Sequence, residues 1–198
     1  MLLPFSQRAR RWEPIALELR QIVRANGHDQ LNPWELAPEV ALKVLDGHAM
    51  LRRLPAAVQS HLVGAGKDRW SGGVYPHPLS DGDLVCILNP FQSHRRQKIT
   101  LMEEITHIYL DHIPSGVAYA APGIEVREYH KDQEAEAYGV GAATLLPWHS
   151  FFKALNAGQT IEVLAELHNV AEELVEYRIK ITGAFNLYKS RQRTRNTA

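Results

Sequence analysis

The stretch from Thr100 to His112 constrains the fold most, because it combines an apolar helical pattern with ionisable side chains. Leu101, Ile105 and Ile108 recur at i, i+4 and i+7, the spacing that predicts a helix with one buried face. Acidic and imidazole groups stand among these apolar residues. Burying such groups costs free energy unless they pair or bind a metal, so the pattern indicates a functional helix.

Glu103 and His107 occupy positions i and i+4 of this helix, so their side chains project from one side, one turn apart. Glu104 lies beside them. This is the layout of H-E-x-x-H, in which two ligands hold zinc and the glutamate between them activates water. Glu103 stands where that motif has its first histidine. Because glutamate also ligates zinc through oxygen, geometry allows Glu103 and His107 as metal ligands.

A catalytic zinc takes three protein ligands, so a third is expected from a helix that packs closely on the first. The segment from Gln133 to Leu146 predicts such a helix, because it is dominated by alanine and glycine, and Asp132 is expected to cap it. Glu134 lies near its start. Glu136 is the competing candidate, but it points about 200° away round the helix. Only one of the two can face the site, and the sequence does not choose between them.

Other roles for these residues compete with metal binding. Thr100 and Glu103 match a capping box, in which Glu103 would bond the backbone at the start of the helix. Glu103 could instead pair with the nearby Arg95 or Arg96. His94 and His112 are expected to be exposed or capping residues, and either is a replacement ligand if the fold brings it round.

Composition restricts the function classes. Lys+Arg and Asp+Glu both number 22, which argues against binding nucleic acid through bulk charge. The segments 161–168 and 171–181 could form a helix-turn-helix, but the second carries three glutamates that would face phosphates, so DNA binding is the weaker alternative.

The expected compartment is the cytoplasm. Cys86 is the single cysteine and lies in an apolar strand-like run, so we expect a buried residue and no disulfide framework. No apolar run is long enough to cross a bilayer, and the first residues have too short an apolar core for a signal peptide.

The chain resembles the ImmA/IrrE metallopeptidases, which are gluzincin-like enzymes with H-E-x-x-H and a downstream glutamate. The resemblance covers residues 34–181 and is sharpest at 89–90, 95–97, 100–112 and 134–147. The last block is similar to the family's E-x-E-A-(N/D)-x-F-A-x-x-L-L-x-P, with Tyr138 and Val140 as departures. This registration implies that His107 and Glu134 are metal ligands and that Glu104 is the general base. Glu103 then replaces the first ligand.

The resemblance implies an α+β zincin-like domain with a small β-sheet, a central active-site helix and a helical C-terminal subdomain. We expect the first domain to span residues 1–147 and the helical subdomain, with its basic tail, to span 148–198. The implied cofactor is zinc. The alternatives are manganese, which two carboxylates and one imidazole would favour, or no metal.

The family is linked to cleavage of helix-turn-helix repressors in mobile-element and stress regulation. The expected partner is therefore a protein or peptide substrate such as a transcription repressor. A pseudoenzyme that binds such a partner without cutting it is the alternative.

Overall fold

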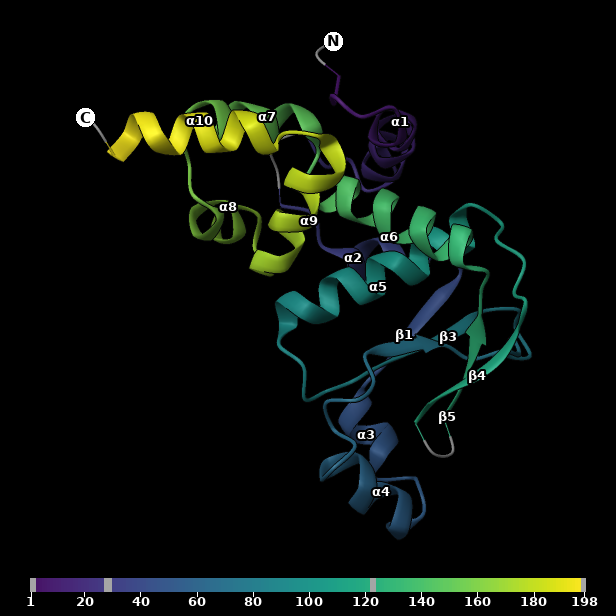
Figure 1. The fold of residues 1–198 in the computed structure, drawn as a ribbon. Coiled ribbons are helices and arrows are strands. Elements are labelled where there is room, and N and C mark those ends of the chain that lie inside the picture. The colour runs from purple at the N-terminus through teal and green to yellow at the C-terminus, as the bar shows by residue number, and fades with distance from the viewer. Residues whose placement is uncertain (1–2, 27–29, 122–123, 197–198) are drawn as a thin grey trace. The chain divides into compact units, whose positions relative to one another are not determined.

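The computed structural model describes residues 3–26, 30–121 and 124–196. Helices and short strands combine in the α+β, zincin-like class that the sequence predicts (Figure 1). The chain divides into two compact units, one of residues 33–137 and one that joins 1–32 with 138–198. These units differ from the expected domains of residues 1–147 and 148–198. That domain division stays a prediction. Within the described ranges, no helix combines the length and apolar character that crossing a membrane requires.

The unit of residues 33–137 contains the sheet, the hairpin and the central helix. Its elements in chain order are α2 (Pro33–Leu36), the 3-10 helix η1 (Ala37–Val40), β1 (Leu42–Leu45), α3 (Gly47–Leu51), α4 (Ala56–Val63), β2 (Gly72–Val74), β3 (Leu84–Leu88), α5 (His94–Tyr109), β4 (Gly116–Ala121), β5 (Ile124–Glu128) and the first turns of α6 (Lys131–Leu145). The short helix α3 is not predicted by the sequence pattern. Asp46 caps it, accepting a hydrogen bond from the Ala49 N–H at 2.9 Å.

A three-stranded sheet supports the central helix. The strand order is β1-β3-β2, with β1 parallel and β2 antiparallel to β3. The middle strand carries Cys86, which is fully buried, as its apolar neighbours predict. Helix α5 contacts β2 and β3 (Figure 1), and β4 and β5 form a separate antiparallel hairpin.

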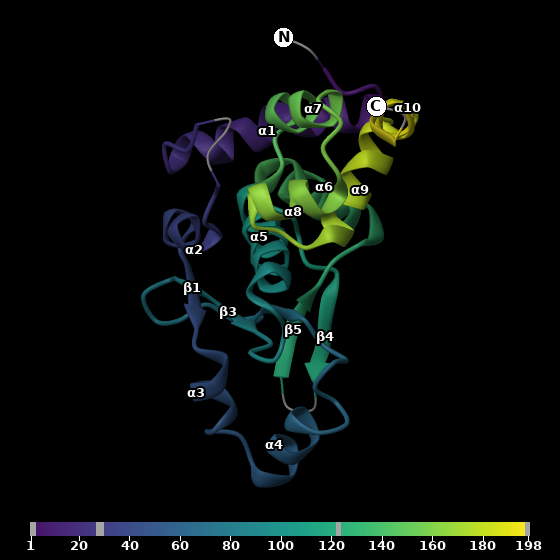
Figure 2. The ribbon, with the colours of Figure 1, turned by 90° about the vertical axis from the view of Figure 1, so that its left-hand side faces the viewer.

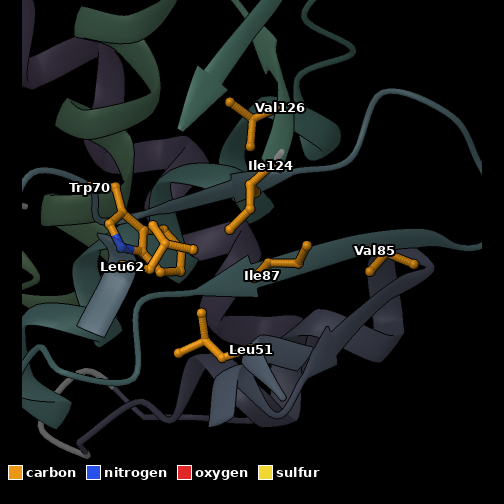
Figure 3. Close-up of a cluster of buried hydrophobic side chains, with 7 residues drawn as sticks. All are labelled: Leu51, Leu62, Trp70, Val85, Ile87, Ile124 and Val126. Carbon is orange, nitrogen blue, oxygen red and sulfur yellow. The ribbon is translucent and has the colours of Figure 1, made fainter. Parts of the chain in front are cut away.

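A hydrophobic cluster joins the sheet to the hairpin. It contains the buried side chains Leu51, Leu62, Trp70, Val85, Ile87, Ile124 and Val126 (Figure 3). Two views of the chain show α4 near the end of the hairpin where β5 begins (Figures 1 and 2), and its Leu62 belongs to the same cluster as Ile124. At Gly73, an added Cβ would lie 2.5 Å from Val126, so β2 and β5 can approach only because this residue has no side chain.

Helix α5 begins earlier than the capping-box hypothesis requires. Ser93 is the N-cap, and its Oγ accepts a hydrogen bond from the Arg96 N–H at 3.2 Å. Thr100 is buried inside the helix, where its hydroxyl donates to the Arg96 carbonyl at 3.4 Å. The capping box of Thr100 and Glu103 is therefore wrong, and Glu103 is free of that role. Asp132 likewise lies inside the first turn of α6 and is not its cap.

The second unit is helical. It contains α1 (Gln7–Ile22), α7 (Trp148–Asn156), α8 (Ile161–His168), α9 (Glu172–Thr182), α10 (Phe185–Asn196) and the part of α6 from Tyr138 onward. The buried Arg178 guanidinium pairs with Glu13 and donates to the Leu146 carbonyl at 2.9 Å. Glu13 also accepts from the Trp148 N–H at 3.0 Å. Because both charges are paired and hydrogen-bonded, they can be buried together.

Helices lie near both ends of the described chain. Residues 7–12 form the start of α1, which Ser6 caps. The basic C-terminal run forms α10, where Arg191 donates to the Asn156 side chain at 2.7 Å. Gln192 binds the Gly158 and Gln159 carbonyls. These partners are distant in sequence, so local composition did not reveal them.

The small-residue helix α6 makes one close approach that tests its packing. A Cβ at Gly139 would lie 2.2 Å from the buried Trp12 ring, so the packing leaves no room for a side chain at this position. Gly139→Ala is expected to reduce the free energy of unfolding, because about 1–3 kcal/mol of overpacking outweighs the gain of about 1 kcal/mol in helix propensity. Urea denaturation measures this change.

Trp12→Leu supplies the matched background. If the clash causes the loss, Gly139→Ala costs less in that background than in the wild type. Equal costs in both backgrounds, or a stabilised Gly139→Ala variant, would contradict the packing described for α6.

Candidate metal centre

Two helices of the 33–137 unit bring three predicted site residues together. Helix α5 supplies Glu103 and His107, and the first turn of α6 supplies Glu134. One ligand atom from each lies within 4.8 Å of the other two. His107 Nε2 is 3.5 Å from Glu134 Oε2. This is the group that the sequence predicts as metal ligands, although metal binding itself stays a prediction.

The choice between Glu134 and Glu136 is resolved by the geometry of α6. Glu134 faces His107, whereas Glu136 Oε2 lies 3.5 Å from Nε2 of His112. The two glutamates therefore contact different histidines, as their separation of about 200° round the helix requires. His94 stacks on the Trp34 indole, with ring centroids 4.6 Å apart, and lies about 20 Å along α5 from His107. It is not part of the group.

His107 is held in a nearly closed environment. Its side chain is 1% exposed, and the Tyr129 ring stacks on it with centroids 3.7 Å apart at 17°. Its Nδ1 lies 3.0 Å from Nδ1 of His112. Neither contact was predicted from the sequence, although the position of His112 just past the end of α5 is a signal that could have suggested the second.

Glu103 and Glu104 are partly buried and close to other acidic groups. Burial raises the pKa of Glu103 to about 8, helped by the charges of Glu104 and Glu134, while Arg96 opposes the shift. Burial and the Glu134 charge likewise raise the pKa of Glu104 to about 8, against Arg127 and a hydrogen bond from the Val74 backbone. In the metal-free protein both carboxyl groups therefore hold protons near neutral pH.

The donor set fits a divalent cation. Two ligands of tetrahedral zinc, each about 2.0–2.1 Å from the metal, lie about 3.3 Å apart. The distance of 3.5 Å between His107 Nε2 and Glu134 Oε2 is close to that separation. A cation would also offset the repulsion that raises the carboxyl pKa values. Two carboxylates and one imidazole suit zinc or a harder ion such as manganese.

Comparison with known proteins gives one match. A family model described as the IrrE N-terminal-like domain of peptidase M78 matches residues 74–180, more than half of the chain and the whole of the Glu103, His107 and Glu134 group. Neither the curated proteins nor the solved structures contain a match.

The raised carboxyl pKa values predict how pH affects the metal-free protein. Glu103 has a pKa of about 8 in the folded protein against an ordinary value of 4.5, so the folded state binds more protons between these pH values. Its contribution to stability is therefore present below pH 4.5 and lost as pH rises to 8. Glu103→Gln removes this loss. Relative to the wild type, the variant should gain about 1 kcal/mol or more of stability between pH 5 and pH 8.

Chemical denaturation in the presence of a chelator, at several pH values, measures the difference between the two proteins. Asp132→Asn is the control, since this exposed carboxylate lies in the first turn of α6 outside the group, and its difference from the wild type should stay flat. A pH-independent difference for Glu103→Gln would contradict the electrostatics described for the site.

Proposed function

Because this chain belongs to the peptidase M78 family with an IrrE N-terminal-like domain, we propose that it is a regulatory metal-dependent peptidase. Glu103, His107 and Glu134 hold the cation, and Glu104 is the general base. The observation that carries the proposal is the convergence of three ligand atoms within 4.8 Å of one another.

A divalent cation bound there would lower the pKa of a water molecule and polarise a peptide carbonyl. Glu104 extends from the same helix turn as Glu103, where the Val74 backbone bonds its carboxylate. In this position Glu104 accepts a proton from the attacking water and returns it to the departing amine.

Glu103 changes the charge of the site relative to H-E-x-x-H. Two carboxylates neutralise a divalent cation, whereas one carboxylate and two imidazoles leave a net charge of +1. The water is therefore less acidified than in a zinc site with two histidines. We expect activity to rise at more alkaline pH and manganese to compete with zinc more effectively than it does at a site with two histidines.

The substrate of this proposal is a protein or peptide, with a helix-turn-helix transcription repressor as the first candidate. One observation favours a second function, a pseudoenzyme that binds such a repressor without cutting it. The pKa values of Glu103 and Glu104 near 8 let these two carboxyl groups stay largely protonated at neutral pH in the metal-free protein. The fold could then keep these side chains together without metal.

Metal titration distinguishes the two functions. After chelation and dialysis, the wild type is expected to bind one equivalent of zinc or manganese by calorimetry and elemental analysis. Glu134→Gln should weaken binding at least about tenfold, because it removes a charged ligand. Asp132→Asn removes a charge from the same turn of α6 without touching the group and should leave affinity unchanged. If the wild type binds neither metal while Glu103→His gains zinc, the pseudoenzyme is favoured.

Cleavage then tests the base. The metal-loaded wild type should cut fluorescent casein or a helix-turn-helix repressor, and Glu104→Gln should bind metal but lose about 100-fold or more in rate. Activity that survives Glu104→Gln rules out Glu104 as the base. A metal-loaded wild type that binds a repressor and leaves it intact supports the pseudoenzyme.

A further inference from the structure

The end of α5 folds back on the candidate metal centre. Asp111 takes the left-handed conformation at φ 51°. The Asp111 N–H bonds the Ile108 carbonyl and the His112 N–H bonds the His107 carbonyl, both at 3.0 Å. These two bonds define a Schellman motif, which places His112 beside His107. The side chains that meet in this motif are usually apolar. Here both are imidazoles.

The two imidazoles form one chain of contacts with acidic groups at both ends. His107 Nδ1 lies 3.0 Å from His112 Nδ1. The other nitrogen of each ring faces a different glutamate at 3.5 Å, Glu134 for His107 and Glu136 for His112. A neutral imidazole carries a proton on only one nitrogen, so the protonation of one ring determines that of the other.

Metal binding selects one of the two possible arrangements. His107 must present a proton-free Nε2 to a cation, so its proton lies on Nδ1 and is donated to His112 Nδ1. His112 then carries its own proton on Nε2, which faces the Glu136 carboxylate. In the reverse arrangement His107 Nε2–H would point at Glu134 and could not ligate. Once Glu134 ligates the cation, Glu136 is the carboxylate left to accept a ring proton, which favours the first arrangement.

Neighbouring residues hold the two imidazoles in position. The His112 side chain is 7% exposed, and Tyr129 covers the His107 ring. With its amide oriented to suit its neighbours, Gln133 binds both backbone groups of Ile113, at 3.1 and 3.2 Å. The segment after His112 is therefore fixed to the start of α6, next to Glu134 and Glu136.

We propose that His112 and Glu136 are positioning residues that hold His107 in the tautomer with its proton on Nδ1, leaving Nε2 free for the cation. The inference rests on the proposed function for the identity of the ligand. It replaces the role of substitute ligand considered for His112, since both of its ring nitrogens are already engaged by His107 and Glu136.

Two substitutions of His112 separate hydrogen bonding from packing. Asn places an oxygen near the position of Nδ1 and so keeps an acceptor for His107, whereas Phe keeps a ring and removes the acceptor. We expect His112→Phe to weaken zinc binding by about 10–100-fold. His112→Asn should restore most of this loss. Glu136→Gln should weaken binding less than His112→Phe, and His130→Phe, at an exposed position before α6, is the control.

The tautomer itself is measured without metal. Nitrogen-15 NMR of the metal-free protein distinguishes imidazole N–H from bare nitrogen, and we expect the wild type and His112→Asn to carry more of the His107 proton on Nδ1 than His112→Phe does. In His112→Phe the proton should lie on Nε2, which faces Glu134. The inference would be overturned if the wild-type His107 proton lay on Nε2. It would also be overturned if folded His112→Phe kept the zinc affinity of the wild type, or if His112→Asn bound zinc as weakly as His112→Phe.

The same experiment keeps the two proposals distinguishable. If the wild type binds neither zinc nor manganese, the metal-dependent function fails, while the NMR measurement still decides the tautomer. If the wild type binds zinc but His112→Phe changes neither affinity nor tautomer, the function stands and the role of His112 falls.

Discussion

The buried imidazole of His107 is the group on which the arrangement of this site depends. Its side chain is 1% exposed, and a buried polar ring needs partners for both nitrogens. The start of α6 supplies a carboxylate for Nε2, and the Schellman end of α5 supplies His112 for Nδ1. The start of α6 and the Schellman end of α5 therefore both serve the imidazole of His107.

Electrostatic repulsion is the second constraint. Burial and mutual repulsion raise the pKa values of Glu103 and Glu104 to about 8. A divalent ion bound in the proposed site would offset this repulsion, so the energy that the arrangement costs the metal-free protein would contribute to the affinity for a cation. Under the proposal, Glu103 would compensate more of the metal charge and make the bound water less acidic.

The sequence predicted the elements whose residues carry their own signal. The i, i+4 pattern predicted α5, the apolar run predicted β3, and the spacing of Glu103 and His107 predicted their convergence. It could not choose between Glu134 and Glu136, because that choice depends on how α6 packs on α5. The role of His112 depends on the left-handed conformation of Asp111, a backbone choice that residue type alone does not fix. The capping box failed because Ser93, further upstream, starts the helix.

Anomalous X-ray diffraction from crystals of the zinc-loaded protein tests the central claim most directly. One peak is expected in the unit of residues 33–137, within about 2.0–2.2 Å of His107 Nε2 and of a carboxylate oxygen from both Glu103 and Glu134. A peak bound instead by His112 and Glu136, or none at the zinc edge despite saturating metal, would contradict the claim that these three side chains form the metal centre.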